Sequence, residues 1–343
     1  MKSKKLLAFL MAAVMVAGVL SGCGGSKTEA PADTAPADNA GAEAPADTEI
    51  AWPERDITLT VGFAAGGDCD TATRFLADAL TKELGVNVVV VDMAGSNGGI
   101  ATEEINATSD PEYNFLVMLS GSLAGNPVTG VTELSYKDFE PVCSFGNYSG
   151  ETLYVAADAP YDTFEEFVEY AKTNTVKMGV AMGGSLYMTC AALKDAAGLD
   201  GLELLDAGDG VNRMLAILGG TIDCTFASYS SGRDYIENGD FKQLATLCVD
   251  RIAAAPDMPC VAETYPSVNM YHRFAILAKG GTDQAICQKL NDAIQNVYAN
   301  DPEYVKSMED YTFQSAKPMT IEETVADMEA QYETFQGMAK YVG

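Results

Sequence analysis

The sequence predicts an α/β protein with two lobes, each built on a mostly parallel sheet flanked by helices. From Trp52 onward, short β-branched runs alternate with amphipathic segments. This strand–helix order is typical of a parallel sheet covered by helices on both faces. The chain has 343 residues, which at about 150 residues per domain allows two such units. Hydrophobic residues make up 48% of the chain, which is enough to fill two cores and excludes a wholly disordered protein.

Residues 1–23 have the features of an export signal. Three lysines within the first five residues precede an apolar run over 6–20, which is shorter than the ~20 residues of a membrane-spanning helix. The run ends in Leu-Ser-Gly-Cys at 20–23, which resembles a bacterial lipobox. We therefore expect lipidation at Cys23 and an extracytoplasmic protein, anchored by lipid to the cell membrane of a monoderm bacterium. An ordinary secretory signal that happens to precede a cysteine is the alternative.

Residues 24–51 are expected to be a disordered acidic tether. They consist mainly of Ala, Pro, Asp, Thr and Glu, with almost no bulky apolar side chain, so they cannot bury enough surface to fold. The folded part is expected to begin at Trp52. We place the first part of lobe 1 at 52–154, lobe 2 at 155–274 and a return to lobe 1 at 275–343.

The acidity of the chain excludes several classes of partner. Asp and Glu number 49 against 21 Lys and Arg, which gives a formal net charge of -28. Phosphate binding needs clustered basic residues, so nucleic acid is excluded, and membrane contact is expected through the lipid anchor only. The chain contains one histidine, His272, which removes most histidine-based catalysis and most zinc chemistry. We expect no metal and no cofactor.

The elements of the first lobe follow from periodicity. A β-branched strand is expected at 57–63, and a helix with its apolar residues on one face is expected at 71–84. The near-continuous apolar run at 88–91 is typical of a strand buried on both sides in a parallel sheet. A helix near 100–107 and a strand at 115–119 continue the alternation.

The elements of the second lobe and of the C-terminus follow in the same way. Capping-box patterns at Thr163-x-x-Glu166 and Thr320-x-x-Glu323 predict two helix starts, and the first helix is expected to run through Ala171. Strands are expected at 176–181, 202–205, 222–227, 244–249 and 274–278. Helices are expected at 186–197, 211–218, 233–237 and over the apolar series 286–297.

The cysteines do not form a disulfide or metal framework. Seven remain after Cys23, an odd number, and no C-x-x-C pair occurs. Most of the seven lie in apolar stretches, where a cysteine is usually a small core residue. We expect free thiols, and hence a reducing habitat. The residues are Cys69, Cys143, Cys190, Cys224, Cys248, Cys260 and Cys287.

Four glycine-rich loops follow predicted strands, at 63–70, 95–99, 120–127 and 183–185. In the first loop, adjacent glycines let backbone N–H groups approach a ligand at the start of the next helix, which suits an anion. The alternative is a tight turn in which Asp68 or Asp70 caps the helix. One such loop is more often a turn than a site, but four at the ends of parallel strands favour a cleft that binds a small molecule.

No catalytic constellation is present. Ser185 lacks the G-x-S-x-G frame, because Tyr187 stands where the second glycine belongs. The first loop has no Walker lysine, so it does not predict a nucleotide site. We expect that the protein is not an enzyme.

A series of motifs resembles the substrate-binding proteins of tripartite tricarboxylate transporters, also called the Bug family. The likeness covers residues 52–343. It rests on Trp-Pro-Glu-Arg-Asp-Ile-Thr-Leu at 52–59, Ala-Ala-Gly-Gly at 64–67 with Asp70 and Arg74, the loop 95–99, Asn126 in 120–127, Gly184-Ser185, Leu-Gly-Gly-x-x-Asp at 218–223 and Asp257-x-Pro259.

The resemblance implies a type II periplasmic-binding-protein fold, a two-lobe Venus flytrap without catalysis. The protein would act as a monomer, capture a small carboxylate and deliver it to integral membrane subunits of a secondary transporter. In this family, ligands are bound by loop amides, ordered water and hydroxyl-rich loops of both lobes. Carried over, the ligand-binding residues are Ala65, Gly66, Gly67, Ser120, Ser122, Asn126, Gly184 and Ser185, with Asp70 and Asp223 ordering loops or setting specificity.

Two departures from the family pattern concern the ligand. Met188 replaces a histidine, and Asp206-Ala-Gly-Asp209 replaces a lysine-containing turn. We therefore include Asp206 and Asp209 among the ligand-binding candidates and expect a ligand that is amino-acid-like, or at least less anionic than a tricarboxylate. The alternative is that the two acids cap the helix that follows. A ligand-sensing lipoprotein that uses the same lobes without transport is the alternative function.

Overall fold

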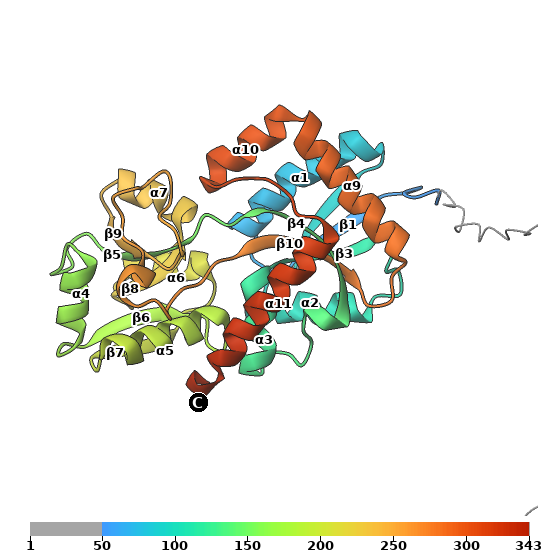
Figure 1. Ribbon diagram of the computed structural model, residues 1–343. Helices are drawn as coiled ribbons and strands as arrows, with labels where there is room; N and C mark the ends of the chain where they lie inside the picture. Colours follow the sequence, from blue (N-terminus) through green and yellow to red (C-terminus); the bar gives the residue numbers. More distant parts are fainter. Residues whose placement is uncertain (1–49, 343) are drawn as a thin grey trace, which may run out of the picture. The chain divides into compact units, whose positions relative to one another are not determined.

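The structure is a computed structural model that describes residues 50–342, and within them the strands form two five-stranded sheets (Figure 1). The expected tether and lipidation site, Cys23 included, lie outside these residues except for 50 and 51. The described part begins at Ile50, which packs against the first hydrophobic core. No helix within residues 50–342 is both long and apolar enough to cross a bilayer.

Lobe 1 is built on a sheet with the strand order β2-β1-β3-β10-β4. Its strands are β1 (Ile57–Val61), β2 (Val88–Asp92), β3 (Asn114–Leu119), β4 (Phe139–Asn147) and β10 (Arg273–Lys279). Its helices are α1 (Asp68–Leu84), α2 (Gly99–Ala107), α3 (Ser120–Thr129), α9 (Gln284–Asn300), α10 (Pro302–Thr312) and α11 (Ile321–Gly337), with short 3-10 turns η1 (Ser96–Gly98), η2 (Tyr136–Asp138) and, at the C-terminal end, η3 (Ala339–Tyr341).

Lobe 2 is built on a sheet with the order β7-β6-β8-β5-β9. Its strands are β5 (Glu151–Ala156), β6 (Val176–Val180), β7 (Leu202–Asp206), β8 (Cys224–Ser228) and β9 (Phe241–Thr246). Its helices are α4 (Phe164–Ala171), α5 (Ser185–Ala197), α6 (Gly210–Leu218), α7 (Tyr229–Glu237) and α8 (Val261–Thr264).

Both sheets are mostly parallel, as the sequence predicts. In lobe 1, β1 pairs in parallel with β2 and β3, and only β10 runs against its neighbours. In lobe 2, β6 pairs in parallel with β7 and β8, and only β5 runs against its neighbours. Each antiparallel strand is the first strand that the chain forms after it crosses from the other lobe. The chain crosses to lobe 2 at 148–150, between β4 and β5, and returns to lobe 1 after Met270, which still lies in the main core of lobe 2.

The side-chain alternation of the strands fills a core on both faces of each sheet. In β3, Phe115 and Val117 face a core shared with α1, α9 and α10, while Leu116 and Met118 face a second core with α2, α3 and α11. In lobe 2, β5 divides its residues in the same way between a core with α4 and α5 and a core with α6. Each sheet is therefore covered by helices on both sides.

Helix α11 joins the lobes. Its Met328 lies in a core of lobe 1, whereas Phe335 lies in the main core of lobe 2. Figure 1 shows this helix (red) running past α3 towards the second lobe. Thr320 and Glu323 form the predicted capping box at its start. The box predicted at Thr163 is half formed: its hydroxyl caps α4, but the Glu166 carboxylate accepts from the N–H of Asp162.

Three sequence predictions about elements are wrong. Strand β2 is not fully buried, because it is an edge strand whose Val89 and Val91 are 43% and 40% exposed. Strand β9 begins and ends three residues before the predicted 244–249. The hydroxyl-rich segment 120–127 is not a loop but most of helix α3, and its small residues let α3 approach α5. A Cβ atom at Gly125 would stand 3.0 Å from the Cβ of Ser185.

The seven cysteines of the described residues are unpaired. Six are buried, and Cys248 is partly buried. Burial raises their thiol pKa values, to about 12 for Cys287. The thiols are therefore protonated at neutral pH and weak nucleophiles.

Gly150 lies at the first crossing and is required there. Its φ of +93° is costly for a residue with a Cβ atom, and a Cβ would overlap the Cys248 sulfur. We expect Gly150→Ala to lower the free energy of unfolding by about 3 kcal/mol, from backbone strain and overpacking together. Urea unfolding followed by circular dichroism measures this.

Gly85→Ala is the matched control for that substitution. Gly85 also has a positive φ, +72°, but no atom stands within 4 Å of a Cβ placed there. Backbone strain alone should cost about 1 kcal/mol at this position. Equal losses in the two variants would contradict the role given to packing at the crossing.

Candidate functional site: a cavity between the lobes

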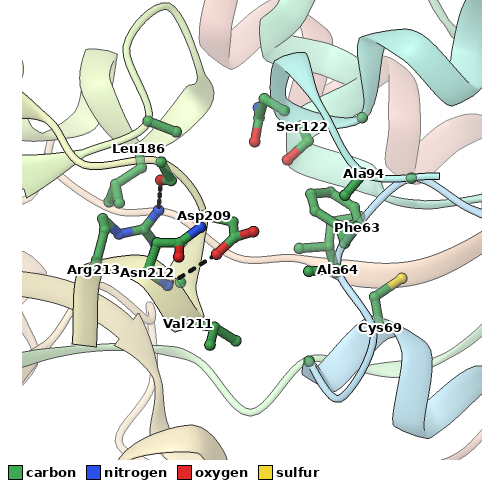
Figure 2. A pocket seen from close by; sticks show the side chains of 18 of the residues that line it. Phe63, Ala64, Cys69, Ala94, Ser122, Leu186, Asp209, Val211, Asn212 and Arg213 are labelled. Atoms are coloured by element: carbon green, nitrogen blue, oxygen red, sulfur yellow. Dashed lines mark hydrogen bonds between the residues drawn. The ribbon is translucent and has the colours of Figure 1, made fainter. Parts of the chain in front are cut away.

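A cavity of about 620 Å³ lies between the two lobes. Its lining comes from segments that follow β1, β2 and β3 in lobe 1 and β6, β7 and β8 in lobe 2. Figure 2 shows the two walls: Phe63, Ala64 and Ser122 face Leu186 and Asp209 across the opening. The cavity thus occupies the carboxyl ends of the parallel strands, where folds of this class bind small molecules.

The structure brings five of the predicted site residues to the cavity and leaves seven outside its lining. The five that line it are Gly67, Ser122, Ser185, Asp206 and Asp209. The other seven are Ala65, Gly66, Asp70, Ser120, Asn126, Gly184 and Asp223.

In the first loop, 63–70, two backbone amides form hydrogen bonds within the protein. The N–H of Gly66 donates to the Asp70 carboxylate at 2.8 Å, and the N–H of Gly67 donates to the carbonyl of Ala64 at 3.2 Å. Asp70 is buried and also pairs with the Arg74 guanidinium at 2.6 Å. These bonds fix the loop against the start of α1, so Asp70 orders the loop from behind the cavity wall.

Asn126 supports the cavity through a neighbour. It exchanges two hydrogen bonds with Asn97, one from each side-chain amide, at 2.8 and 3.0 Å. Asn97 lines the cavity and has a φ of +50°, a strained backbone angle for a residue other than glycine. The Asn97–Asn126 pair holds η1 in this conformation. Gly184 of lobe 2 packs closely against Asn97, because a Cβ on Gly184 would stand 2.8 Å from the Asn97 amide nitrogen.

Ser120 and Asp223 point to other parts of the fold. The Ser120 hydroxyl lies 2.9 Å from the amide nitrogen of Gln331 on α11 and accepts from the N–H of Arg273. Asp223 is exposed and accepts from the N–H of Lys177. It precedes the first residue of β8, whereas the last residue of that strand, Ser228, lines the cavity. Asp223 therefore lies at the opposite end of the strand.

Asp206 and Asp209 line the cavity and also order the turn before α6. Asp209 is the N-cap of α6 and accepts from the N–H of Asn212 at 3.0 Å. Asp206 accepts from the N–H groups of Met182 and Gly208 at longer distances, 3.4 and 3.3 Å. The two explanations left open by the sequence, a helix cap and a cavity charge, are therefore compatible for Asp209.

Arg213 is a cavity residue that the sequence reasoning missed. It is 6% exposed, and its guanidinium donates to Thr225, to the carbonyl of Gly208 and to the carbonyl of Phe226 at 3.0, 2.8 and 3.2 Å. These bonds use three of its five N–H donors. No carboxylate of the described residues lies within 4.0 Å of it. A buried cation without a counter-ion is costly, so the site favours an anion.

Glu151 is a second buried charge that the sequence did not indicate. The carboxylate lines the cavity and accepts from the Tyr148 hydroxyl at 3.3 Å, while its other oxygen has no hydrogen-bond partner among the described residues. Burial raises the pKa of Glu151 to about 7, although the charge of Arg213 opposes this shift. The His272 ring lies 3.9 Å away, and burial lowers its pKa to about 4. His272 is therefore neutral at pH 7.

Asp68 joins the two lobes at one side of the cavity. It is buried at the start of α1 and accepts hydrogen bonds from hydroxyl groups rather than from cations. The donors from α7 of lobe 2 are Ser230 at 2.5 Å and Ser231 at 3.0 Å. Ser149, at the first crossing, and Tyr311, on α10, complete the set at 3.1 and 3.2 Å. Neutral donors thus hold the lobes together beside the cavity.

The described residues contain no cluster of His, Cys, Asp and Glu side chains suited to a metal ion. Two of the acidic residues that line the cavity have hydrogen-bond partners of their own. Asp68 accepts from four hydroxyls, and Asp209 accepts from a backbone N–H at the start of α6. The arrangement is that of a binding cavity with one cation and several acids.

The family of the chain follows from a comparison with known proteins. The model described as "Tripartite tricarboxylate transporter family receptor" matches residues 72–329. The chain belongs to this family. A protein of Cupriavidus necator, "UPF0065 protein in gbd 5'region", is 30% identical over 262 residues, 75% of this chain and 78% of that protein. The protein BugT of Bordetella pertussis is 27% identical over 270 residues, 75% of this chain and 81% of BugT.

A solved structure supports the two-lobe fold. MatC of Rhodopseudomonas palustris, solved with bound malate, has a TM-score of 0.73 against this chain. The match covers 85% of this chain and 100% of MatC at 22% sequence identity. The receptor-family match and this likeness together establish the α/β two-lobe binding-protein architecture predicted from the sequence.

Glu151→Gln should change how stability depends on pH. The native pKa of about 7 exceeds the usual glutamate value, so the native state binds more protons and the wild type loses stability as pH rises from about 4.5 to about 7. Gln keeps the shape and cannot ionise. In urea unfolding, we expect the free energy of unfolding of the ligand-free variant, relative to that of the wild type, to rise by about 2.5 kcal/mol between pH 5 and pH 8.

His272 acts in the opposite direction, because its native pKa of about 4 lies below the usual value and stability rises with pH from about 4 to about 6.5. His272 is present in both proteins, so the difference between them isolates Glu151. A difference that stays constant over this pH range would show that Glu151 is not perturbed.

Proposed function

We propose that the protein is the extracytoplasmic solute-binding component of a tripartite tricarboxylate-type secondary transporter. It captures a small organic solute that carries a carboxylate in the cavity between its lobes. It then delivers the solute to the integral membrane subunits. Membership of the receptor family and the position of the cavity at the strand ends support this proposal.

The observation that carries the proposal is the buried guanidinium of Arg213. It lines the cavity, has no carboxylate partner among the described residues and retains two N–H donors beyond its three bonds to the protein. A ligand carboxylate would supply the missing counter-charge with charge-assisted hydrogen bonds. The hydroxyls of Ser122 and Ser185, one from each lobe, would add neutral contacts from opposite walls.

The remaining sequence candidates act, in this proposal, by shaping the cavity. Asp70 orders the first loop, and Asn126 orders η1 through Asn97. Gly66 and Gly67 then use their amides within the protein and, with Ala65, form the turn before α1, while Gly184 lets α5 approach η1. The lobes close by hydrogen bonds of the kind that Asp68 accepts from α7. The protein works as a monomer and catalyses no reaction.

Arg213→Gln should weaken ligand binding strongly. Removal of one partner of a buried charged hydrogen-bonded pair costs about 2–5 kcal/mol, so the dissociation constant should rise at least ~30-fold. A thermal-shift screen of carboxylates, amino acids and aromatic acids identifies a ligand, and titration calorimetry compares the variants. A ligand at 100 times its dissociation constant stabilises the native protein by about 2.7 kcal/mol, so the screen can detect it.

Arg55→Gln is the control for lost positive charge. Arg55 is exposed and pairs with Asp110 at 2.6 Å, outside the cavity lining. This variant should bind the ligand as the wild type does. Undiminished binding by Arg213→Gln would contradict the proposed carboxylate contact.

The location proposed for the protein depends on Cys23, which lies outside the described residues. We expect the full chain, expressed in a bacterium, to incorporate radiolabelled palmitate and to sediment with the membrane. Cys23→Ala should abolish the label and release the protein into the soluble extracytoplasmic fraction. Labelling that persists in this variant would contradict lipidation at this residue.

A further inference from the structure

The cavity contains an unsatisfied negative charge as well as an unsatisfied positive one. Glu151 is 4% exposed and lines the cavity. One of its oxygens has a single long hydrogen bond, from Tyr148, and the other has none among the described residues. Buried carboxylates in proteins are normally paired with a cation or with several donors. A group that enters the cavity can supply a donor for Glu151.

The neighbours of Glu151 do not provide that donor. His272 lies 3.9 Å away, beyond hydrogen-bond distance. Arg213 influences Glu151 through its charge, but no guanidinium nitrogen lies within 4.0 Å of a Glu151 carboxylate oxygen, so the two groups form no ion pair. Opposite charges thus line one cavity without direct contact.

The charge balance of the cavity also disfavours a purely anionic ligand. Among the described residues that line the cavity, Arg213 is the only lysine or arginine, whereas four residues are acidic. A dicarboxylate or tricarboxylate would bring two or three further negative charges against one cation. The four acids are Asp68, Glu151, Asp206 and Asp209.

We propose that the ligand is a zwitterion of the amino-acid type, with its carboxylate at Arg213 and its ammonium group at Glu151. This inference rests on the proposed function and specifies the chemical class of the solute. A zwitterion satisfies both unpaired groups at once. It also adds no net charge to a cavity that is already acidic.

The pH dependence of binding distinguishes a cationic group at Glu151 from an anionic one. An ammonium group requires the ionised carboxylate, whereas a carboxylate at this position requires the protonated acid. An aminated ligand should therefore bind about tenfold tighter at pH 8 than at pH 6, and an acid without the amino group should show the reverse trend. The other charged or titratable groups that interact with Glu151 are Asp68 on α1, Tyr148 before β5, Tyr154 on β5, Cys190 on α5, Arg213 on α6, Cys248 after β9 and His272 before β10.

The test compares acids of one carbon skeleton with and without an α-amino group. The probes are 2-aminobutyrate and butyrate, aspartate and succinate, glutamate and glutarate, and phenylalanine and 3-phenylpropanoate. Titration calorimetry measures each with the wild-type protein at pH 8. For the skeleton that fits the cavity, we expect the aminated acid to bind at least ~10-fold tighter, because it alone pairs with Glu151. In Glu151→Gln this advantage should fall to less than ~3-fold.

Glu203→Gln is the matched control. Glu203 is exposed on β7 and does not line the cavity. This variant should keep the full preference for the aminated acid. The comparison of acids in the wild-type protein needs no variant, so it decides the question even if Glu151→Gln does not fold.

The possible failures are separable. If the acids without an amino group bind as tightly as their aminated partners or tighter, the inference is wrong while carboxylate capture stands. An unchanged preference in folded Glu151→Gln also contradicts the inference. If no acid of either kind binds, both the proposed function and the inference fail.

Discussion

The candidate site depends on the burial of one guanidinium group. Arg213 extends from α6 to the turn after β7 and to β8, where two backbone carbonyls and the Thr225 hydroxyl hold it. These acceptors fix its position but leave its charge uncompensated by any carboxylate of the described residues. Its field opposes the rise in the pKa of Glu151 and contributes to the low pKa of His272. The electrostatic character of the cavity thus depends on this residue.

The contacts of Asp68 between the lobes of this strongly acidic chain involve no cation among the described residues. Asp68, at the start of α1, accepts from hydroxyls of both lobes. Hydroxyl donors satisfy a buried carboxylate and can be exchanged for water when the lobes separate, without the desolvation penalty of a second charge. The net charge of -28 is therefore compatible with the carboxylate binding that we propose.

The sequence predicted the architecture well because the architecture depends on local periodicity. The alternation of strands and helices, the caps at Thr320 and Asp209 and the cleft at the strand ends all follow from short patterns. The segment at 120–127 was misjudged because glycine and serine usually indicate a loop, whereas here their small size allows α3 to pack closely on α5. Helix packing of this kind is a tertiary effect and has no local signal.

The candidate site was predicted only in part, for the same reason. The sequence indicated the loops that line the cavity, but it did not indicate its two buried charged residues, Glu151 and Arg213. Glu151 begins a strand, and Arg213 lies within an amphipathic helix, so neither belongs to a motif. The one available signal was a lone arginine in the apolar stretch 211–218 of a base-poor chain. That Asp70, Ser120 and Asn126 bond to the protein rather than line the cavity could be seen only in three dimensions.

A crystal structure with the tightest-binding acid is the most direct test of this account. We predict that a carboxylate oxygen of the ligand lies within hydrogen-bond distance of a guanidinium nitrogen of Arg213, and that its ammonium nitrogen lies equally close to the Glu151 carboxylate. A ligand held only by the loop at 64–67 and the start of α1, with Arg213 bonded solely to Gly208, Thr225 and Phe226, would contradict it.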